Sequence, residues 1–204
     1  YEISCSLVGS EMCIRDSVKT AIEGSVKYGL GWADVGYYGI YDYCVNVKDC
    51  AAEKEILKKG ADKLVDNYAG SGFGSTTGGS YVWGSNMVVA DNGILLLMAS
   101  KVLGDDSYVD YAADQLNYIL GRNAVSYCYV TGYGSQTPEN PHHRPSEALG
   151  KAMPGMLVGG ADGNLEDPYA KAVLAKIPKE RCYVDNAQSY SCLLYTSPSP
   201  RDCS

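Results

Sequence analysis

Hydrophobic residues between positions 50 and 121 recur with the 3.6-residue period of helices. Residues 50–69 carry one apolar stripe among Lys, Glu and Asp, which predicts an amphipathic helix with Asp49 as its N-cap. The stripe consists of Ile56, Leu57, Leu64 and Val65. Asn86 to Leu103 is an apolar segment too long for a strand, and Gly104 is a typical helix stop, so we expect a buried helix there.

A third helix is expected after Asp106, a candidate N-cap, and ends at Gly121. Its apolar residues share one helical face. They are Val109, Ala113, Leu116 and Leu120. Residues 86–121 are therefore predicted to form a helical hairpin, and Ser25 to Val45 is expected to be helical as well. Four helices without alternating apolar and polar runs favour an all-α array of helical hairpins.

The pattern changes between Ser126 and Tyr183, where Gly, Pro, Asn and Asp recur every few residues. Only Asp167 to Ile177 is predicted to be helical there, with Asp167 as N-cap and Pro168 at the first helical position. Loops of this length inside a compact domain are usually functional or disordered, and the density of Tyr, Val, Met and Leu argues against disorder. We therefore expect the functional surface in this segment.

Composition argues against several classes of partner. The chain has 204 residues, 46% of them hydrophobic, and 17 Lys and Arg against 24 Asp and Glu give a net charge of −7. The basic residues do not cluster, which argues against nucleic acid. The apolar stretch around Gly93 to Ala99 is too short to cross a bilayer, so no membrane insertion is expected, and no signal-peptide pattern opens the sequence.

The aromatic composition favours a groove that binds sugars. The chain has eighteen Tyr and two Trp against one Phe, and Tyr and Trp rings combine an apolar face with a polar edge.

Asn140 to Pro145 contains the two histidines of the chain beside an arginine. Because each proline disfavours helical geometry at the residue before it, Asn140 and Arg144 are expected to be extended, and His142 and Arg144 should then share a face. Together they can donate several hydrogen bonds to sugar hydroxyls and hold a carboxylate. The alternative is a loop histidine paired with a local carbonyl. A metal site is disfavoured because the spacing supplies no third ligand.

The two ends of the chain differ from the middle. One oligonucleotide can encode Leu7 to Ser17 on one strand and Cys192 to Arg201 on the other, and it resembles a sequencing-library adapter. Residues 1–17 and 192–204 are therefore expected to be translated read-through outside the fold, with residues 18–191 as the domain. Four cysteines lie in the domain without a CxxC pair, which leaves their pairing open. They are Cys44, Cys50, Cys128 and Cys182.

Seven segments of the middle region resemble, in order, glycoside hydrolase family 9. They are Gly31-Trp-Ala-Asp34, Trp83-Gly-Ser-Asn86, Gly121-Arg-Asn-Ala124, Ser126 to Gly134, Pro141-His-His-Arg-Pro145, Pro154 to Gly160 and Tyr183 to Tyr190. The family consists mainly of cellulases, and the similarity covers residues 24–191. The resemblance implies a partial (α/α)6 toroid of helical hairpins with long substrate-cleft loops. It also implies hydrolysis of β-1,4-glucosidic bonds with inversion at the anomeric carbon.

The resemblance assigns roles by position. His142 and Arg144 match the family's substrate-gripping H-x-R, and His142 is also a supporting catalytic candidate. Asp185 matches the acidic residue of a second signature, again as a supporting catalytic candidate, and Tyr190 matches its substrate-binding aromatic. Four residues further the family places its general-acid glutamate, where this chain has Leu194. The family's catalytic aspartates would lie before residue 18. Because inverting hydrolysis needs an acid and a base about 6.5 to 9.5 Å apart, the chain as written is expected to be inactive.

Trp83 and Tyr133 are candidates for stacking on glucosyl rings, with core or rim roles as the alternative. Alternating oxygen ligands also resemble a calcium loop. The candidate ligands are Asp162, Asn164 and Glu166. Val173 stands where a bidentate glutamate belongs, so turn and cap roles are favoured. No cofactor is required, and calcium is kept as an alternative.

The resemblance implies a monomeric fragment of a secreted endo-β-1,4-glucanase that acts on cellulose, cello-oligosaccharides or related β-glucans. Two alternatives stay open: a non-catalytic β-glucan-binding module on the same scaffold, and a helical scaffold for protein partners. An incomplete ring of hairpins is also expected to expose apolar helix flanks and to be marginally stable.

Overall fold

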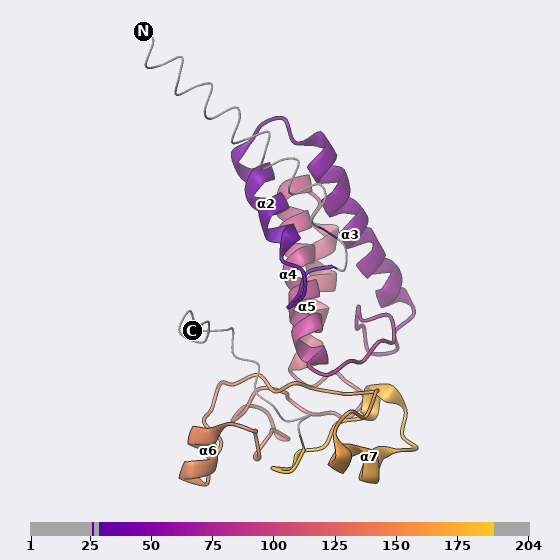
Figure 1. Cartoon of the computed structure of the whole chain (residues 1–204). Coiled ribbons are helices and arrows are strands. Elements are labelled where there is room, and N and C mark those ends of the chain that lie inside the picture. Colours follow the sequence, from indigo (N-terminus) through magenta and orange to yellow (C-terminus); the bar gives the residue numbers. More distant parts are fainter. Residues whose placement is uncertain (1–25, 27–28, 190–204) are drawn as a thin grey trace.

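The computed structural model describes residue 26 and residues 29–189 (Figure 1). Within these residues the regular structure is helical apart from isolated bridges, which confirms the all-α prediction. The helices are α2 (Gly36–Asn46), α3 (Ala51–Ala69), α4 (Ser85–Leu103), α5 (Ser107–Ile119), α6 (Arg144–Leu149), α7 (Pro168–Leu174) and the 3₁₀ helix η1 (Lys179–Arg181). Figure 1 shows α2 to α5 side by side in one column, with the later loops spread across one end of it.

The column of α2 to α5 encloses one hydrophobic core. α4 packs against α5 and α3, and α2 packs against α3 and α4. Ile40, Leu57 and Leu96, from three different helices, are completely buried in it. Burial of each such side chain stabilises the fold by about 1.5–3 kcal/mol. The predicted stripe of α3 and the hairpin of α4 and α5 are therefore confirmed.

The helix starts differ from the sequence expectation. The predicted cap of α3 is wrong, because the N-cap is Cys50 rather than Asp49 and its side chain makes no capping hydrogen bond. Asp106 occupies the N-cap position of α5 as expected, but the carboxylate that accepts the Ser107 N–H, at 3.0 Å, belongs to Asp105. Several acidic residues near one helix start thus compete for one capping position, and the sequence pattern does not rank them.

The N-terminal helix is shorter than expected. α2 begins at Gly36, while Gly31 and Asp34 face each other in an isolated antiparallel bridge, so this part of the predicted helix is a tight turn. Oδ1 of Asp34 accepts the N–H of Gly36 at 2.9 Å. A carboxylate that bonds a backbone N–H two residues later favours a turn over a continuing helix. Residues 25, 27 and 28 of the predicted helix lie outside the described residues.

α4 is long and apolar enough to cross a membrane by length and composition alone, with 19 residues and a mean hydropathy of 1.3. One face of α4, however, is buried in the protein interior, while Ile94 and Leu97 stay exposed. Val89 and Leu95 are buried, and the Asn92 amide donates to Thr76 Oγ1 at 2.9 Å. The hydropathy of α4 therefore follows from its place at the centre of the core. Gly104 ends α4 in the left-handed conformation, as predicted.

The apolar face predicted for α5 is exposed rather than buried. Its members Val109, Ala113, Leu116 and Leu120 all lie at the surface. The opposite face is buried, and it carries Tyr108, Ala112, Gln115, Tyr118 and Ile119. Val109 and Leu116 join Ile94 and Leu97 of α4 to line an apolar groove of about 350 Å³, here named the α4–α5 groove. The expectation of an exposed apolar flank is therefore met on this side of the column.

Residues 122–189 form a loop layer that includes the predicted loop of residues 126–183 and is fixed to the start of α4. The prediction that only residues 167–177 are helical there is wrong, because α6 and η1 also form in this layer. Val130 and Leu157 form an isolated antiparallel bridge within it. The Asn86 amide donates to the Val158 carbonyl at 2.9 Å. Gly160 has a φ of +85°, and a Cβ there would lie 2.4 Å from Asn86, so only glycine permits this close approach. These contacts hold the loop layer on the end of the helical column.

α7 starts as predicted. Oδ1 of Asp167 accepts the Tyr169 N–H at 2.8 Å, and Pro168 occupies the first turn. The helix ends at Leu174, earlier than predicted, because the chain turns there and the Ile177 N–H bonds the Leu174 carbonyl. The Asp167 cap and Pro168 therefore located the start of α7 correctly, whereas the sequence pattern placed its end three residues too late.

Candidate functional site

The segment from Pro141 to Arg144 is not uniformly extended. His143 has φ −140° and ψ 111°, but Arg144 is the first residue of α6, with Pro145 in the first turn. Proline suits this position because the N–H groups of a first turn have no intrahelical partner. The expectation of an extended Arg144 is therefore wrong, and the alternation argument for a face shared with His142 does not apply.

Each histidine has a polar partner on α6. Nδ1 of His142 lies 3.3 Å from Oε1 of Glu147, and both side chains are partly exposed. Nδ1 of His143 lies 2.9 Å from the buried Ser146 hydroxyl. Arg144 is exposed. The start of α6 and the two histidines before it thus present imidazole, carboxylate and guanidinium groups, all of which can hydrogen-bond a polar ligand.

Asp185 holds the chain immediately before this segment. Its Oδ1 accepts the Asn140 N–H at 2.9 Å, and its Oδ2 accepts the Glu139 N–H at 2.8 Å. The Tyr127 hydroxyl donates to Oδ2 as well, at 3.2 Å. Hydrogen bonds to a charged acceptor are stronger than neutral ones, so the carboxylate fixes the path of the backbone leading to His142. In this structure Asp185 acts as a positioning residue.

A cavity of about 330 Å³ lies where the two signature segments meet. Pro141 lines it from the first segment, Glu147 from α6, and Ala187 from the second segment. The structure therefore brings the predicted His142 and Asp185 regions together. Tyr190 and Leu194 lie outside the described residues.

Three aromatic side chains are exposed near the loop end of the column. Trp83 is 48% exposed and Tyr133 is 58% exposed, which argues against the core alternative for both. Trp32 is 81% exposed, and sequence reasoning did not single it out as a binding residue. The signal was present in the Gly31-Trp-Ala-Asp34 segment, which forms a turn rather than a helix and turns the indole outward.

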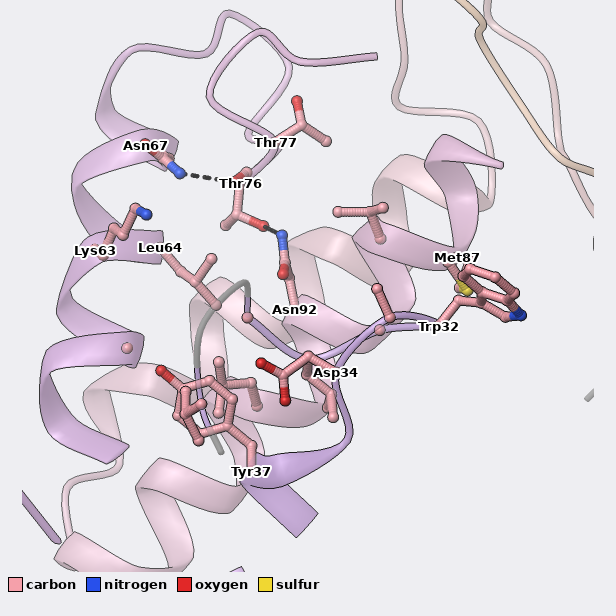
Figure 2. Close-up of a pocket in the computed structure, with 18 residues that line it drawn as sticks. Trp32, Asp34, Tyr37, Lys63, Leu64, Asn67, Thr76, Thr77, Met87 and Asn92 are labelled. Atoms are coloured by element: carbon pink, nitrogen blue, oxygen red, sulfur yellow. Dashed lines mark hydrogen bonds between the residues drawn. The ribbon is translucent and has the colours of Figure 1, made fainter. Parts of the chain in front are cut away.

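A second cavity, of about 460 Å³, lies between the Trp32 turn, α3 and α4 (Figure 2). Figure 2 shows Trp32 at one end, beside Met87, and Lys63 and Asn67 at the other. The Asn67 amide donates to the Thr76 carbonyl at 3.1 Å. This cavity therefore has a wall of ordered polar groups with an exposed indole at its rim.

Asp91 lies behind the Trp32 turn. A Cβ added to Gly31 would lie 3.7 Å from Oδ2 of Asp91. Burial raises the pKa of the Asp91 carboxyl to about 6, because the charged form loses its hydration. Burial raises the pKa of the Tyr38 hydroxyl, and the nearby Asp91 carboxylate raises it further by a smaller amount. A partly buried carboxyl thus lies close to Gly31, one of the residues that line the second cavity.

Among the calcium candidates, Asp162 accepts hydrogen bonds from nearby backbone N–H groups. Asp162 is 1% exposed, its Oδ1 accepts the Asn164 N–H at 3.1 Å and its Oδ2 accepts the Glu166 N–H at 3.0 Å. These bonds support the turn role that the sequence favoured. Within the part of the chain that the structure describes, no group of three or more His, Cys, Asp or Glu side chains is placed to hold a metal ion.

Fold and site together define an all-α protein with a loop-built polar and aromatic surface, the class to which helical-toroid hydrolases belong. The family model for glycosyl hydrolase family 9 matches residues 14–193. This chain belongs to glycosyl hydrolase family 9.

Individual relatives agree with this assignment. A cellodextrinase of Butyrivibrio fibrisolvens is 30% identical, over 87% of this chain and 34% of its own length. A xyloglucan-specific endo-β-1,4-glucanase of Bacteroides ovatus is 30% identical, over 90% of this chain and 33% of its own length. The solved structure of AaCel9A, in complex with cellobiose-like isofagomine, is 34% identical with a TM-score of 0.75, over 83% of this chain and 34% of that chain.

The chain spans about a third or less of the length of the curated relatives it matches. The four helices of the column and the loop layer correspond to part of the (α/α)6 barrel of the family. The predicted fold class is therefore confirmed.

Proposed function

We propose that this chain supplies part of the substrate cleft of an endo-β-1,4-glucanase that acts on cellulose or related β-glucans. The observation that carries the proposal is the anchoring of the His142 segment by Asp185, which joins two signature segments around one cavity. Relatives described as endoglucanase, cellodextrinase and cellobiosidase support the same substrate class.

The exposed aromatics supply the stacking surface of the proposed cleft. A pyranose ring presents apolar C–H faces, so it stacks on Trp32, Trp83 or Tyr133 while its hydroxyls hydrogen-bond polar neighbours. His142, just before α6, and Arg144, its first residue, supply such polar groups. The combination suits a neutral polar polymer, because it offers flat apolar area together with directed hydrogen bonds.

We also propose that the 204-residue polypeptide binds glucan without cleaving it. Inverting hydrolysis requires a carboxylic acid that protonates the leaving oxygen and a carboxylate that activates water. Leu194 stands where the family pattern has the acid, and leucine has no proton to donate. The parent enzyme is proposed to be secreted and monomeric. Residues 1–17 and 192–204 are proposed to be adapter read-through, which resequencing of the template across both junctions will test.

Binding is measured by tryptophan fluorescence and calorimetry with cellotetraose, and cleavage by reducing-end release from soluble cellulose. We expect binding without release. Trp32→Ala and Trp83→Ala should each weaken binding by about 1–2 kcal/mol if a sugar stacks there. Leu97→Ala, on the α4–α5 groove, is the control and should bind normally. If the folded protein shows no binding of cellotetraose in either measurement, the glucan proposal is overturned and a scaffold for protein partners is favoured. Reducing-end release would overturn the proposed inactivity.

A further inference from the structure

Two cysteines face each other across the turn between α2 and α3. Cys44 lies near the end of α2, and Cys50 is the N-cap of α3. The Cys50 thiol contacts the Cys44 carbonyl oxygen at 3.8 Å, which places Cys50 Sγ beside Cys44. Both are free thiols in this structure. The chain therefore holds two free thiols close together at the junction of α2 and α3.

We propose that Cys44 and Cys50 are an oxidation site, which a low-molecular-weight disulfide such as oxidised glutathione converts into a disulfide bond between α2 and α3.

The other two described cysteines have different surroundings. Cys128 and Cys182 are buried in the loop layer, where their thiols contact backbone carbonyl oxygens. Cys50 is 2% exposed and belongs to the core of the helical column, with Cys44 partly buried at its edge. The pair thus combines a partly exposed cysteine with a buried one.

The reaction proceeds by two thiol–disulfide exchanges. The Cys44 thiolate attacks one sulfur of oxidised glutathione, forms a mixed disulfide and expels one glutathione thiolate. The Cys50 thiolate then attacks the Cys44 sulfur, closes the protein disulfide and expels the second glutathione thiolate. The two protons lost by the cysteines are taken up by the two glutathione molecules. The protein dithiol is oxidised by two electrons and one oxidised glutathione is reduced.

The environment explains why the pair persists as a dithiol without an oxidant. Burial, followed by the hydrogen bond and charge interaction with Cys50 and the nearby Glu53 carboxylate, raises the pKa of Cys44 to about 12, while Lys54 opposes this. Because the thiolate is the nucleophile, exchange at neutral pH is slow and needs an added disulfide. Once formed, the bond would restrict the unfolded chain and hold α2 against α3.

Peptide mapping tests the proposal on the full chain. Trypsin cleaves after Lys48, so the two cysteines fall in peptides 28–48 and 49–54, each of which contains no other cysteine. After incubation with oxidised glutathione, denaturation with alkylation, and digestion, we expect these two peptides to be recovered as one disulfide-linked species. Its mass should equal their sum minus two hydrogens. The oxidised protein should melt roughly 5 °C higher than the reduced one.

Two sets of variants make the test specific. Cys44→Ser and Cys50→Ser should each lose the linked species and the rise in melting temperature. Cys128→Ser and Cys182→Ser, matched controls outside the pair, should keep both. Stable glutathionylation of Cys44 without closure, or preferential linkage of either cysteine to another partner, would overturn the proposal. Because mapping of the unmodified chain decides the pairing, a variant that fails to fold does not affect the outcome.

Discussion

The carboxylate of Asp185 accepts the backbone N–H of Asn140 at 2.9 Å, across 45 residues of sequence. With the neighbouring bond to the Glu139 N–H, this contact fixes the chain just before His142. One acidic side chain thus joins the two segments whose patterns first indicated the family. Its role here is exerted through the backbone, so its loss should disturb the loop as a whole.

Asp185→Asn is expected to destabilise the loop layer by about 1–3 kcal/mol, because an amide keeps one acceptor oxygen and turns a donor toward a backbone donor. Amide hydrogen exchange at Glu139 and Asn140 should accelerate, and urea unfolding gives the free energy. Tyr127→Phe removes the 3.2 Å bond but leaves the two backbone bonds to Asp185 in place, so it should cost less. Unchanged exchange at both amides in Asp185→Asn would contradict the positioning role.

Asp114 makes stability depend on acid pH. Bonds from Arg122, then from Tyr68, lower the pKa of Asp114 to about 2. Arg122 Nη2 lies 2.7 Å from the carboxylate. Since the folded pKa is below the unfolded value, this contribution is present above about pH 4 and is lost as pH falls toward 2.

Asp114→Asn is therefore expected to lower stability by about 1 kcal/mol at neutral pH and to flatten the decline between pH 4 and 2. Thermal unfolding across that range measures both effects. Asp66→Asn, on the exposed surface of α3, is the control and should follow the unmodified chain. A decline of the same slope in Asp114→Asn would show that other carboxylates cause it.

The contribution of Asp91 to stability depends on pH in the opposite direction to that of Asp114. Burial raises its pKa to about 6, so the folded state binds the proton more tightly than the unfolded state. This contribution to stability is full below about pH 4 and decreases as pH rises through 6. Asp91→Asn should stabilise the chain at pH 7 by about 1–2 kcal/mol, allowing for partial solvent screening, and should make little difference at pH 4. Urea unfolding at both pH values checks this, and a loss of stability at pH 7 would contradict it.

The α4–α5 groove should promote self-association of the isolated chain. Leu97 and Leu116 are 49% and 57% exposed within one apolar surface, and contact between two such surfaces removes them from water. The double change Leu97→Glu, Leu116→Glu should reduce light scattering on heating while the helical circular dichroism stays constant. The exposed pair Lys59→Glu, Lys63→Glu on α3 alters charge away from the groove and serves as the control. Equal scattering from all three proteins would argue against the groove as its cause.

The sequence predicted those features that depend on residues close together in the chain. The apolar stripe of α3, the extent of α4 and the Asp167 cap of α7 were all recognisable, because helix period and capping act within one or two turns. The order of short motifs likewise identified the family. Where two neighbouring acidic residues could both cap a helix, as Asp105 and Asp106 could, the local pattern did not predict which carboxylate accepts the backbone N–H.

Tertiary structure decided the features that depend on distant segments. Arg144 is helical although Pro145 follows it, because the proline fits a first turn that the surrounding loops allow. The predicted apolar face of α5 is exposed, while a face carrying Gln115 and two tyrosines is buried. The Asp185 contact and the outward position of Trp32 also require segments far apart in sequence to meet. The amino-acid pattern alone determined where α3, α4, α5 and the start of α7 lie and to which family the chain belongs. Only packing between distant segments determined which faces became core, which stayed exposed and which side chain anchors the site, since those energies arise from contacts that no local period encodes.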